Sequence, residues 1–297
     1  MLCAKLPTPR SGQGLKKADL AAQNKDTRSG TGIGSVRRAL ISGNWKMHHD
    51  HLQAIRTVQD LGLRLANSDV SVLDVSVHPP FCDLRSVQTV LEDRGIAVAL
   101  GAQHCYHEDA GAFTGEVSPQ MLARLAVTYV IVGHSERRQF FGQTDEQVAL
   151  TLRAIQRNQM TPILCVGETE FEREDGLTEQ KLETQMKAAL EGLAPHQVAG
   201  IVVAYEPIWA IGTGNTATAS DAQAACSHIR GLLSGFFGAD PAGSVRIQYG
   251  GSVRPENTSE LMSEPDVDGL LVGGASLEAS SFASIVQAAA TTVAAPR

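Results

Sequence analysis

Aromatic residues are scarce in this chain, because Phe, Trp and Tyr make up only 5% of its 297 residues. A hydrophobic share of 43% must therefore build its core mainly from Val, Ile, Leu and Ala. No apolar run approaches the ~20 residues that a transmembrane helix needs, so we expect no membrane partner. The five cysteines are scattered, without a Cys-x-x-Cys pair. This pattern disfavours a disulfide framework and favours reduced thiols, as in the cytoplasm.

Acidic residues are few at the start of the chain. Residues 1–38 hold eight Lys or Arg against two Asp, a net charge of +6, and since the whole chain carries −7, the remainder carries −13. A net charge of −13 on the residues after 38 disfavours nucleic-acid binding. Residues 1–37 lack apolar periodicity, so we expect a disordered basic extension before a single domain at residues 38–297. An organelle transit peptide or a start codon placed too far upstream would have the same composition.

Short apolar runs and helix-period segments alternate through the rest of the chain. Helix spacing occurs at Val148, Leu152 and Ile155, and again at Leu182, Met186, Leu190 and Leu193. Eight runs recur every ~20 to 40 residues, the length of a strand-and-helix unit. They are Ala39–Ser42, Val72–Val77, Ile96–Leu100, Tyr129–Val132, Pro162–Val166, Ile201–Tyr205, Val245–Tyr249 and Gly269–Val272. This alternation predicts an α/β fold, a single (β/α)8 barrel, rather than a doubly wound open sheet, whose first strand is usually followed by a Gly-rich turn.

Polar residues gather where five of the predicted strands end. In a parallel barrel these ends meet on one face, where the active site lies. The segments are Asn44-Trp45-Lys46, Gly133-His134-Ser135-Glu136, Glu206, Tyr249-Gly250-Gly251-Ser252 and Gly273-Gly274-Ala275-Ser276.

Glu206 follows a buried strand and precedes a segment with the composition of a lid. Pro207 stiffens the start of that segment, and Gly212 and Gly214 free its far end. Such a segment can close as one piece over a general base. The alternative is an ordinary strand-end glutamate before a surface turn.

Two glycine pairs, Gly250-Gly251 and Gly273-Gly274, precede predicted helices. Glycine lets main-chain N–H groups approach an anion, and a helix N-terminus adds partial positive charge. Either pair alone would be read as a tight turn, but together they predict a phosphate site, with Ser252 and Gly212 as further donors.

Lys46 and His134 complete the predicted site. Lys46 can direct its ammonium into the barrel mouth, where it would stabilise an oxyanion, although a lone lysine is more often a solvated charge. His134 precedes Ser135, the expected helix N-cap, with Glu136 in the first turn. A helix N-terminus favours a neutral ring, which can donate to a carbonyl oxygen. The alternative is a structural histidine.

Together these segments resemble the triosephosphate isomerase family. The resemblance rests on Gly43–Met47, Val132–Arg138, Ala204–Gly214, Tyr249–Ser252 and Leu271–Leu277. It covers residue 38 to the end, with the motifs in the family's order. It implies isomerisation of dihydroxyacetone phosphate and D-glyceraldehyde 3-phosphate in glycolysis and gluconeogenesis, without metal or organic cofactor.

The resemblance also implies a role for each matching residue. Glu206 would move the proton, His134 would polarise the carbonyl, and Lys46 with Asn44 would stabilise the negative oxygen. Gly212, Ser252, Gly273 and Gly274 would hold the phosphate. Glu136, Ile211, Leu271 and Thr114 would support them: Ile211 and Leu271 by excluding water, and Thr114 from the loop of a second subunit in a homodimer.

One departure from the family pattern lies in the predicted dimer loop, where His104 stands at a position that is commonly Asn. The nearby His104, Cys105, His107 and Glu108 fit no standard zinc spacing, so we predict no metal site. Two other functions remain open: a barrel enzyme for a larger sugar phosphate, and a non-catalytic interaction role of the barrel or its basic tail.

Overall fold

The computed structural model describes residues 37–66, 68–211 and 217–295. Within them, eight parallel strands form a closed barrel in which each strand pairs with its sequence neighbours and β1 pairs with β8. The strands are β1 (Leu40–Asn44), β2 (Asp74–His78), β3 (Ala99–Ala102), β4 (Tyr129–Val132), β5 (Thr161–Val166), β6 (Val202–Tyr205), β7 (Arg246–Tyr249) and β8 (Gly269–Val272). The predicted (β/α)8 barrel is confirmed.

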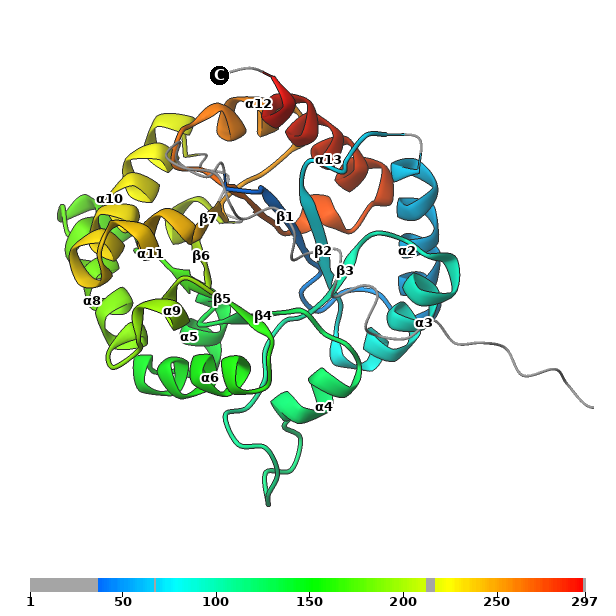
Figure 1. Ribbon diagram of the computed structural model, residues 1–297, viewed down its shortest axis with the longest axis horizontal. Helices are drawn as coiled ribbons and strands as arrows, with labels where there is room; N and C mark the ends of the chain where they lie inside the picture. Colours follow the sequence, from blue (N-terminus) through cyan, green and yellow to red (C-terminus); the bar gives the residue numbers. More distant parts are fainter. Residues whose placement is uncertain (1–36, 67, 212–216, 296–297) are drawn as a thin grey trace, which may run out of the picture. The chain divides into compact units, whose positions relative to one another are not determined.

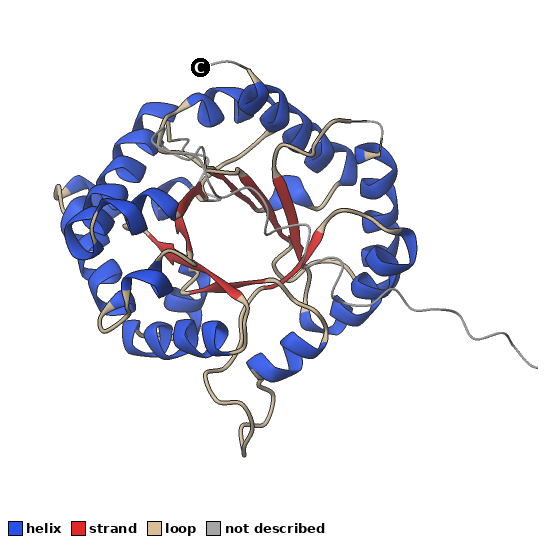
Figure 2. Cartoon of the chain, viewed as in Figure 1, coloured by secondary structure: helices blue, strands red, loops and turns tan. Residues whose placement is uncertain are grey.

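Helices surround this ring of strands (Figure 2). The main helices that follow the strands in turn are α2 (His51–Leu65), α3 (Leu84–Arg94), α4 (Pro119–Arg124), α5 (Ser135–Phe141), α6 (Asp145–Arg157), α8 (Thr178–Leu190), α10 (Ala219–Phe237), α12 (Pro255–Ser263) and α13 (Ala279–Ala294). The connections also contain α7 (Glu170–Glu174), α9 (Pro195–Val198), α11 (Ala239–Ser244) and the 3₁₀ turns η1 (Phe81–Asp83), η2 (Ile208–Ala210) and η3 (Gly274–Ser276). No helix in the described ranges is long and apolar enough to cross a membrane.

The core has two layers, as a barrel requires. A large layer of Val, Ile, Leu and Ala side chains fills the space between strands and helices. A smaller one, centred on Ile131, Ile163 and Val202, fills the barrel interior. Cys165 lies in this inner layer and is fully buried, as expected for a small apolar residue. The interior is therefore packed, which leaves the strand ends to form the site.

The bounds of β4 and β8 match the predicted runs, the other strands differ from them by one to three residues at one or both ends, and two differences have a clear physical reason. The apolar run beginning at Ile96 was predicted as a strand, but β3 starts at Ala99; Ile96 instead packs on Gly62 of α2 within the preceding turn. Leu193 was placed on the same helix as Leu190, but α8 ends at Leu190 and Gly192 turns the chain with φ of 75°. Both residues are apolar because they pack in turns, where periodicity gives no signal.

Ion pairs tie the opposite face of the barrel, where the strands begin. Asp268 accepts from both Arg230 and Arg37, each at 2.6 Å, and Asp74 accepts from Arg246 at 2.8 Å. These pairs join the starts of β1, β2, β7 and β8. The arginines of this face thus have a structural role.

Candidate active site

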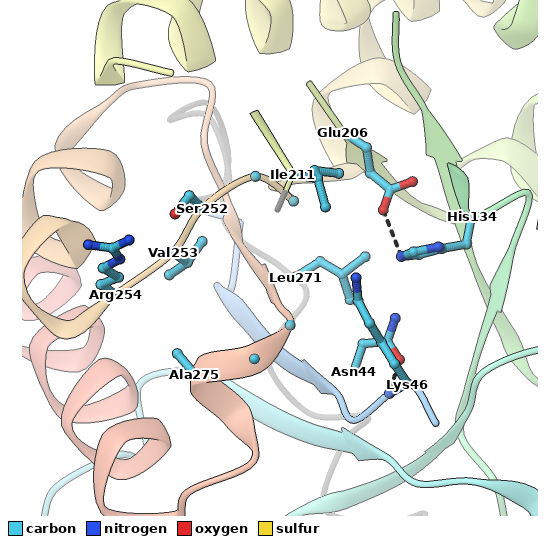
Figure 3. Close-up of a pocket in the computed structure, with 14 residues that line it drawn as sticks. Asn44, Lys46, His134, Glu206, Ile211, Ser252, Val253, Arg254, Leu271 and Ala275 are labelled. Carbon is cyan, nitrogen blue, oxygen red and sulfur yellow. Dashed lines mark hydrogen bonds and ion pairs between the residues drawn. The ribbon is translucent and has the colours of Figure 1, made fainter. Parts of the chain in front are cut away.

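A cavity of about 290 Å³ opens at the carboxyl ends of the strands (Figure 3). Nine of the predicted site residues line it: Asn44, Lys46, His134, Glu206, Ile211, Ser252, Leu271, Gly273 and Gly274. Gly250, Gly251, Val253, Arg254 and Ala275 complete the lining. Gly212, another predicted phosphate ligand, lies outside the described residues.

Glu206 directly follows β6 and is 2% exposed. One carboxylate oxygen, Oε1, lies 2.9 Å from Nε2 of His134 (Figure 3). The other, Oε2, accepts the main-chain N–H of Ser135 at 2.9 Å. Both oxygens are therefore engaged at the start of α5, each with one of its lone pairs.

Two glycines of the neighbouring strand ends make room for Glu206. A Cβ atom at Gly250, after β7, would lie 3.2 Å from Cγ of Glu206, and one at Gly167, after β5, would lie 1.8 Å from its carbonyl oxygen. Gly167 was not predicted as a site residue, because only the register between β5 and β6 shows what it faces.

The buried pair of Glu206 and His134 shifts both pKa values. Burial raises the pKa of a carboxyl group, but His134 and the Ser135 N–H outweigh it and lower the pKa of Glu206 below its ordinary range. For His134, burial opposes the charged ring, but the adjacent carboxylate outweighs it and raises the pKa. Glu206 is therefore held as a carboxylate, ready to accept a proton.

His134 itself is the N-cap of α5, in place of the predicted Ser135. Its Nδ1 accepts the main-chain N–H of Glu136 at 3.2 Å, so in the neutral ring the proton is on Nε2. That proton points at Glu206. The sequence indicated a cap at this position, but Ser135 already lies in the first turn of the helix, and the imidazole takes the capping role.

Lys46 lies just beyond β1 in a strained backbone conformation, with φ of 53°. Its Nζ lies 2.6 Å from Oε1 of Glu136, and its main-chain N–H donates to Oδ1 of Asn44 at 3.0 Å. The ammonium is thus held beside the pocket, and its charge is partly balanced by Glu136.

Gln103 holds the same loop, although it was not predicted as a site residue. Its side-chain amide donates to the carbonyl oxygens of Lys46, at 2.7 Å, and of His78, at 2.9 Å. A glutamine after a strand is common, and only the order of β1, β2 and β3 in the sheet brings it to Lys46.

Ser252 and Ala275 lie on the other side of the cavity from Glu206 (Figure 3). The loop after β8 turns directly into η3, where Ser276 Oγ donates to the carbonyl of Gly273 at 2.7 Å. A Cβ at Gly274 would meet nothing within 4 Å. The main chain here is open to the cavity, as an anion site needs.

Glu168 is a second fully buried carboxylate near the lid segment, and the sequence did not indicate it. It accepts the hydroxyl of Tyr205 at 2.9 Å and the indole N–H of Trp209 at 2.8 Å. Burial raises its pKa. Its bond to Trp209 of η2 ties the start of the lid segment to the end of β5.

Thr114 does not line the cavity of its own chain. It is exposed on the long segment between β3 and α4, which projects from the barrel (Figure 1). His104, at the base of this segment, is buried, with Nε2 3.7 Å from Glu116. Across the described ranges, no group of three His, Cys, Asp or Glu residues is placed to hold a metal ion.

Comparison with known proteins agrees with this geometry. The triosephosphate isomerase family profile matches residues 39–289. Triosephosphate isomerase of Carboxydothermus hydrogenoformans is 51% identical over 252 residues, which cover 85% of this chain and 99% of that protein.

Two further relatives have the same name. The protein of Corynebacterium diphtheriae is 49% identical over 87% of this chain and 99% of its own length, and that of Streptomyces coelicolor is 48% identical over 85% and 98%. The chain therefore belongs to the triosephosphate isomerase family.

Proposed function

We propose that this chain interconverts dihydroxyacetone phosphate and D-glyceraldehyde 3-phosphate, as an isomerase of glycolysis and gluconeogenesis. The observation that carries the proposal is the pairing of the Glu206 carboxylate with the Nε2–H of His134 at the wall of one cavity. A base and a neutral hydrogen-bond donor side by side are what proton transfer next to a carbonyl requires.

Glu206 is the base in this mechanism. Its carboxylate takes a proton from the carbon beside the substrate carbonyl, and the electron pair moves to the carbonyl oxygen to give an enediolate. Glu206, now a carboxylic acid, returns the proton to the neighbouring carbon. Its lowered pKa keeps it ionised beforehand.

His134 donates from Nε2 to the substrate oxygens and moves protons between them. Substrate bound between His134 and Glu206 separates the ring from the carboxylate that raises its pKa, so burial then favours the neutral form. The Glu136 N–H at Nδ1 keeps the proton on Nε2.

Lys46 and Asn44 stabilise the developing negative oxygen, and Glu136 holds the ammonium in place at 2.6 Å. Ser252, Gly273, Gly274 and Gly212 bind the phosphate. Leu271 and Ile211, both in the cavity lining, exclude water when the lid closes.

The active form is a homodimer. Met47, next to Lys46, is 93% exposed, and Phe141 is 69% exposed. With Phe81 they line a second hollow that also reaches Asn44 and His134. The projecting segment that carries Thr114 fits such a hollow on a second copy, where Thr114 would support Asn44 and His134.

Residues 38–297 form the catalytic domain, residues 1–37 precede it, and the protein acts in the cytoplasm. The interaction role considered from the sequence rests on the basic tail, whose residues 1–36 lie outside the described part. No observation favours it or a larger sugar phosphate as substrate.

The test is isomerisation of D-glyceraldehyde 3-phosphate by the purified protein, coupled to glycerol-3-phosphate dehydrogenase and NADH. We expect rapid turnover that Glu206→Gln abolishes and Glu206→Asp, which withdraws the carboxylate by one methylene, lowers by ~10². Glu92→Gln, an exposed change on α3, is the matched control. A folded wild type without turnover would overturn the function, and an active Glu206→Gln variant would remove Glu206 from the base role.

A further inference from the structure

Arg254 lines the active-site cavity on the side of Ser252 and Ala275, across from Glu206 and His134 (Figure 3). It is exposed and comes two residues after Ser252, in the loop that follows β7. None of the ion pairs within the described ranges joins its guanidinium to a carboxylate. It therefore presents an uncompensated positive charge at the edge of the cavity.

The arginines of the opposite barrel face differ in this respect. Arg230 is paired with Asp266 and Asp268, each at 2.6 Å, and Arg246 with Asp74 at 2.8 Å. Those arginines join the starts of strands. Arg254 has no such partner, so a structural ion pair does not account for it.

The local backbone does not account for it either. Arg254 is the N-cap residue of α12, and no side-chain cap hydrogen bond forms there. Ser, Thr, Asp and Asn are favoured at this position, and the partial positive charge of a helix N-terminus repels a cation. A residue that goes against local preference beside a functional cavity points to a role in that cavity.

The charges around the cavity indicate the role. Among the side chains that line the cavity, Glu206 is negative, Lys46 is positive, and the neutral form of His134 adds nothing. Without Arg254 the lining therefore carries no net charge with which to attract a phosphate dianion. With Arg254 the lining carries a net charge of +1, and the added charge lies at the end of the cavity where Ser252 lies.

We propose that Arg254 is a specificity residue that attracts the phosphate group of the substrate into this end of the cavity. The inference rests on the proposed function, because it assigns a further residue to the same substrate. Arg254 is exposed at the edge of the cavity, so its charge acts on the encounter with the phosphate and on its binding, before the chemical step. Arg254 therefore raises kcat/KM and leaves kcat unchanged.

The experiment compares Arg254→Gln with Arg94→Gln in the full chain. Arg94 is an exposed arginine in the last turn of α3, which leads into the start of β3, so the control removes the same charge from the far end of the barrel. At low ionic strength we expect Arg254→Gln to lower kcat/KM for D-glyceraldehyde 3-phosphate by roughly two- to fivefold. Arg254→Glu should lower kcat/KM further, and Arg254→Lys should retain most of the wild-type kcat/KM. The difference in kcat/KM between wild type and Arg254→Gln should become small at high salt.

Two further measurements isolate the phosphate. Inorganic phosphate should inhibit the Arg254→Gln variant less strongly than the wild type, and D-glyceraldehyde, which lacks the phosphate, should be turned over equally by both. Equal kcat/KM and equal salt dependence for Arg254→Gln and Arg94→Gln would overturn the inference. So would a loss confined to kcat.

Failure of the proposed function is a separate result. If the wild type were inactive on triose phosphates, calorimetric binding of inorganic phosphate to the wild type and to Arg254→Gln would still test the residue. Tighter binding to the wild type supports the phosphate role of Arg254, and equal binding overturns it.

Discussion

The side-chain amide of Gln103 donates to the carbonyl oxygen of Lys46 at 2.7 Å. Lys46 has a φ of 53°, a conformation that costs free energy in a residue with a side chain. The bond from Gln103, together with that from the Lys46 N–H to Asn44, holds this conformation from both sides of the residue. The backbone from which the Lys46 side chain projects is therefore held by a residue that follows a different strand, β3.

Replacing Gln103 by Glu should misplace Lys46 with little change in side-chain volume. The carboxylate has no N–H to donate and would face two carbonyl oxygens, those of Lys46 and His78. We expect kcat to fall by ~10-fold or more while the protein stays folded. Steady-state kinetics with far-UV circular dichroism test this. A Gln103→Glu enzyme with wild-type kcat would mean that Lys46 holds its position without this bond.

Gly250→Ala should disturb the base directly. The new Cβ would lie 3.2 Å from Cγ of Glu206, closer than ordinary contact, so the carboxylate must shift by a few tenths of an ångström. We expect kcat to fall by ~10-fold, since small displacements of reacting groups are costly.

Gly235→Ala is the control for Gly250→Ala. A Cβ at Gly235, within α10, meets nothing within 4 Å. Alanine there should keep full activity and stabilise the helix by ~0.5–1 kcal/mol. Equal kcat for both variants would show that the space beside Glu206 is not critical.

The barrel and the main site residues were predictable because they follow short-range rules. Strands and helices alternate along the chain, and in a parallel barrel the strand ends must share a face. Lys46, His134 and Glu206 each stand just past such an end, so their convergence in one cavity could be inferred without any contact being known.

The supporting residues were not predictable in this way. Gln103 acts through the register of β2 and β3, Gly167 through that of β5 and β6, and Glu168 through Trp209, which is 41 residues away in the sequence. Each depends on which atoms of two separate segments come opposite one another. The pattern of a single segment contains no such information.

Thr114→Arg should separate the proposed dimer. Thr114 is exposed on the projecting segment, and an arginine there would bring bulk and charge into an interface lined by Met47 and Phe141. We expect a monomer with strongly reduced kcat, because Asn44 and His134 would lose the support of the second copy. Light scattering and kinetics on the same sample test this, and a fully active monomer would contradict it.

Stability should fall in mild acid because of two buried histidines. Burial lowers the pKa of His78 to about 4, and burial together with Arg137 lowers that of His104 to about 3. Below pH ~6.5 these residues take up protons in the unfolded chain but stay neutral in the folded one. The free energy of unfolding should therefore be highest above pH ~6.5 and fall as the pH drops towards 4 and 3.

Urea unfolding of His104→Asn from pH 7 to pH 5 tests how much His104 contributes to the fall in the free energy of unfolding. Asparagine does not titrate, so the variant should lose less stability over this range, by up to ~1.4 kcal/mol for each pH unit. His48→Asn, an exposed change after β1, should keep the wild-type slope. The raised pKa of His134 acts in the opposite direction, stabilising the folded state as the pH falls, but it is common to all three proteins and cancels in the comparison. If the His104→Asn and wild-type curves ran parallel, His104 would have to be protonated in the folded state, with Glu116 at 3.7 Å as the carboxylate that stabilises its charge.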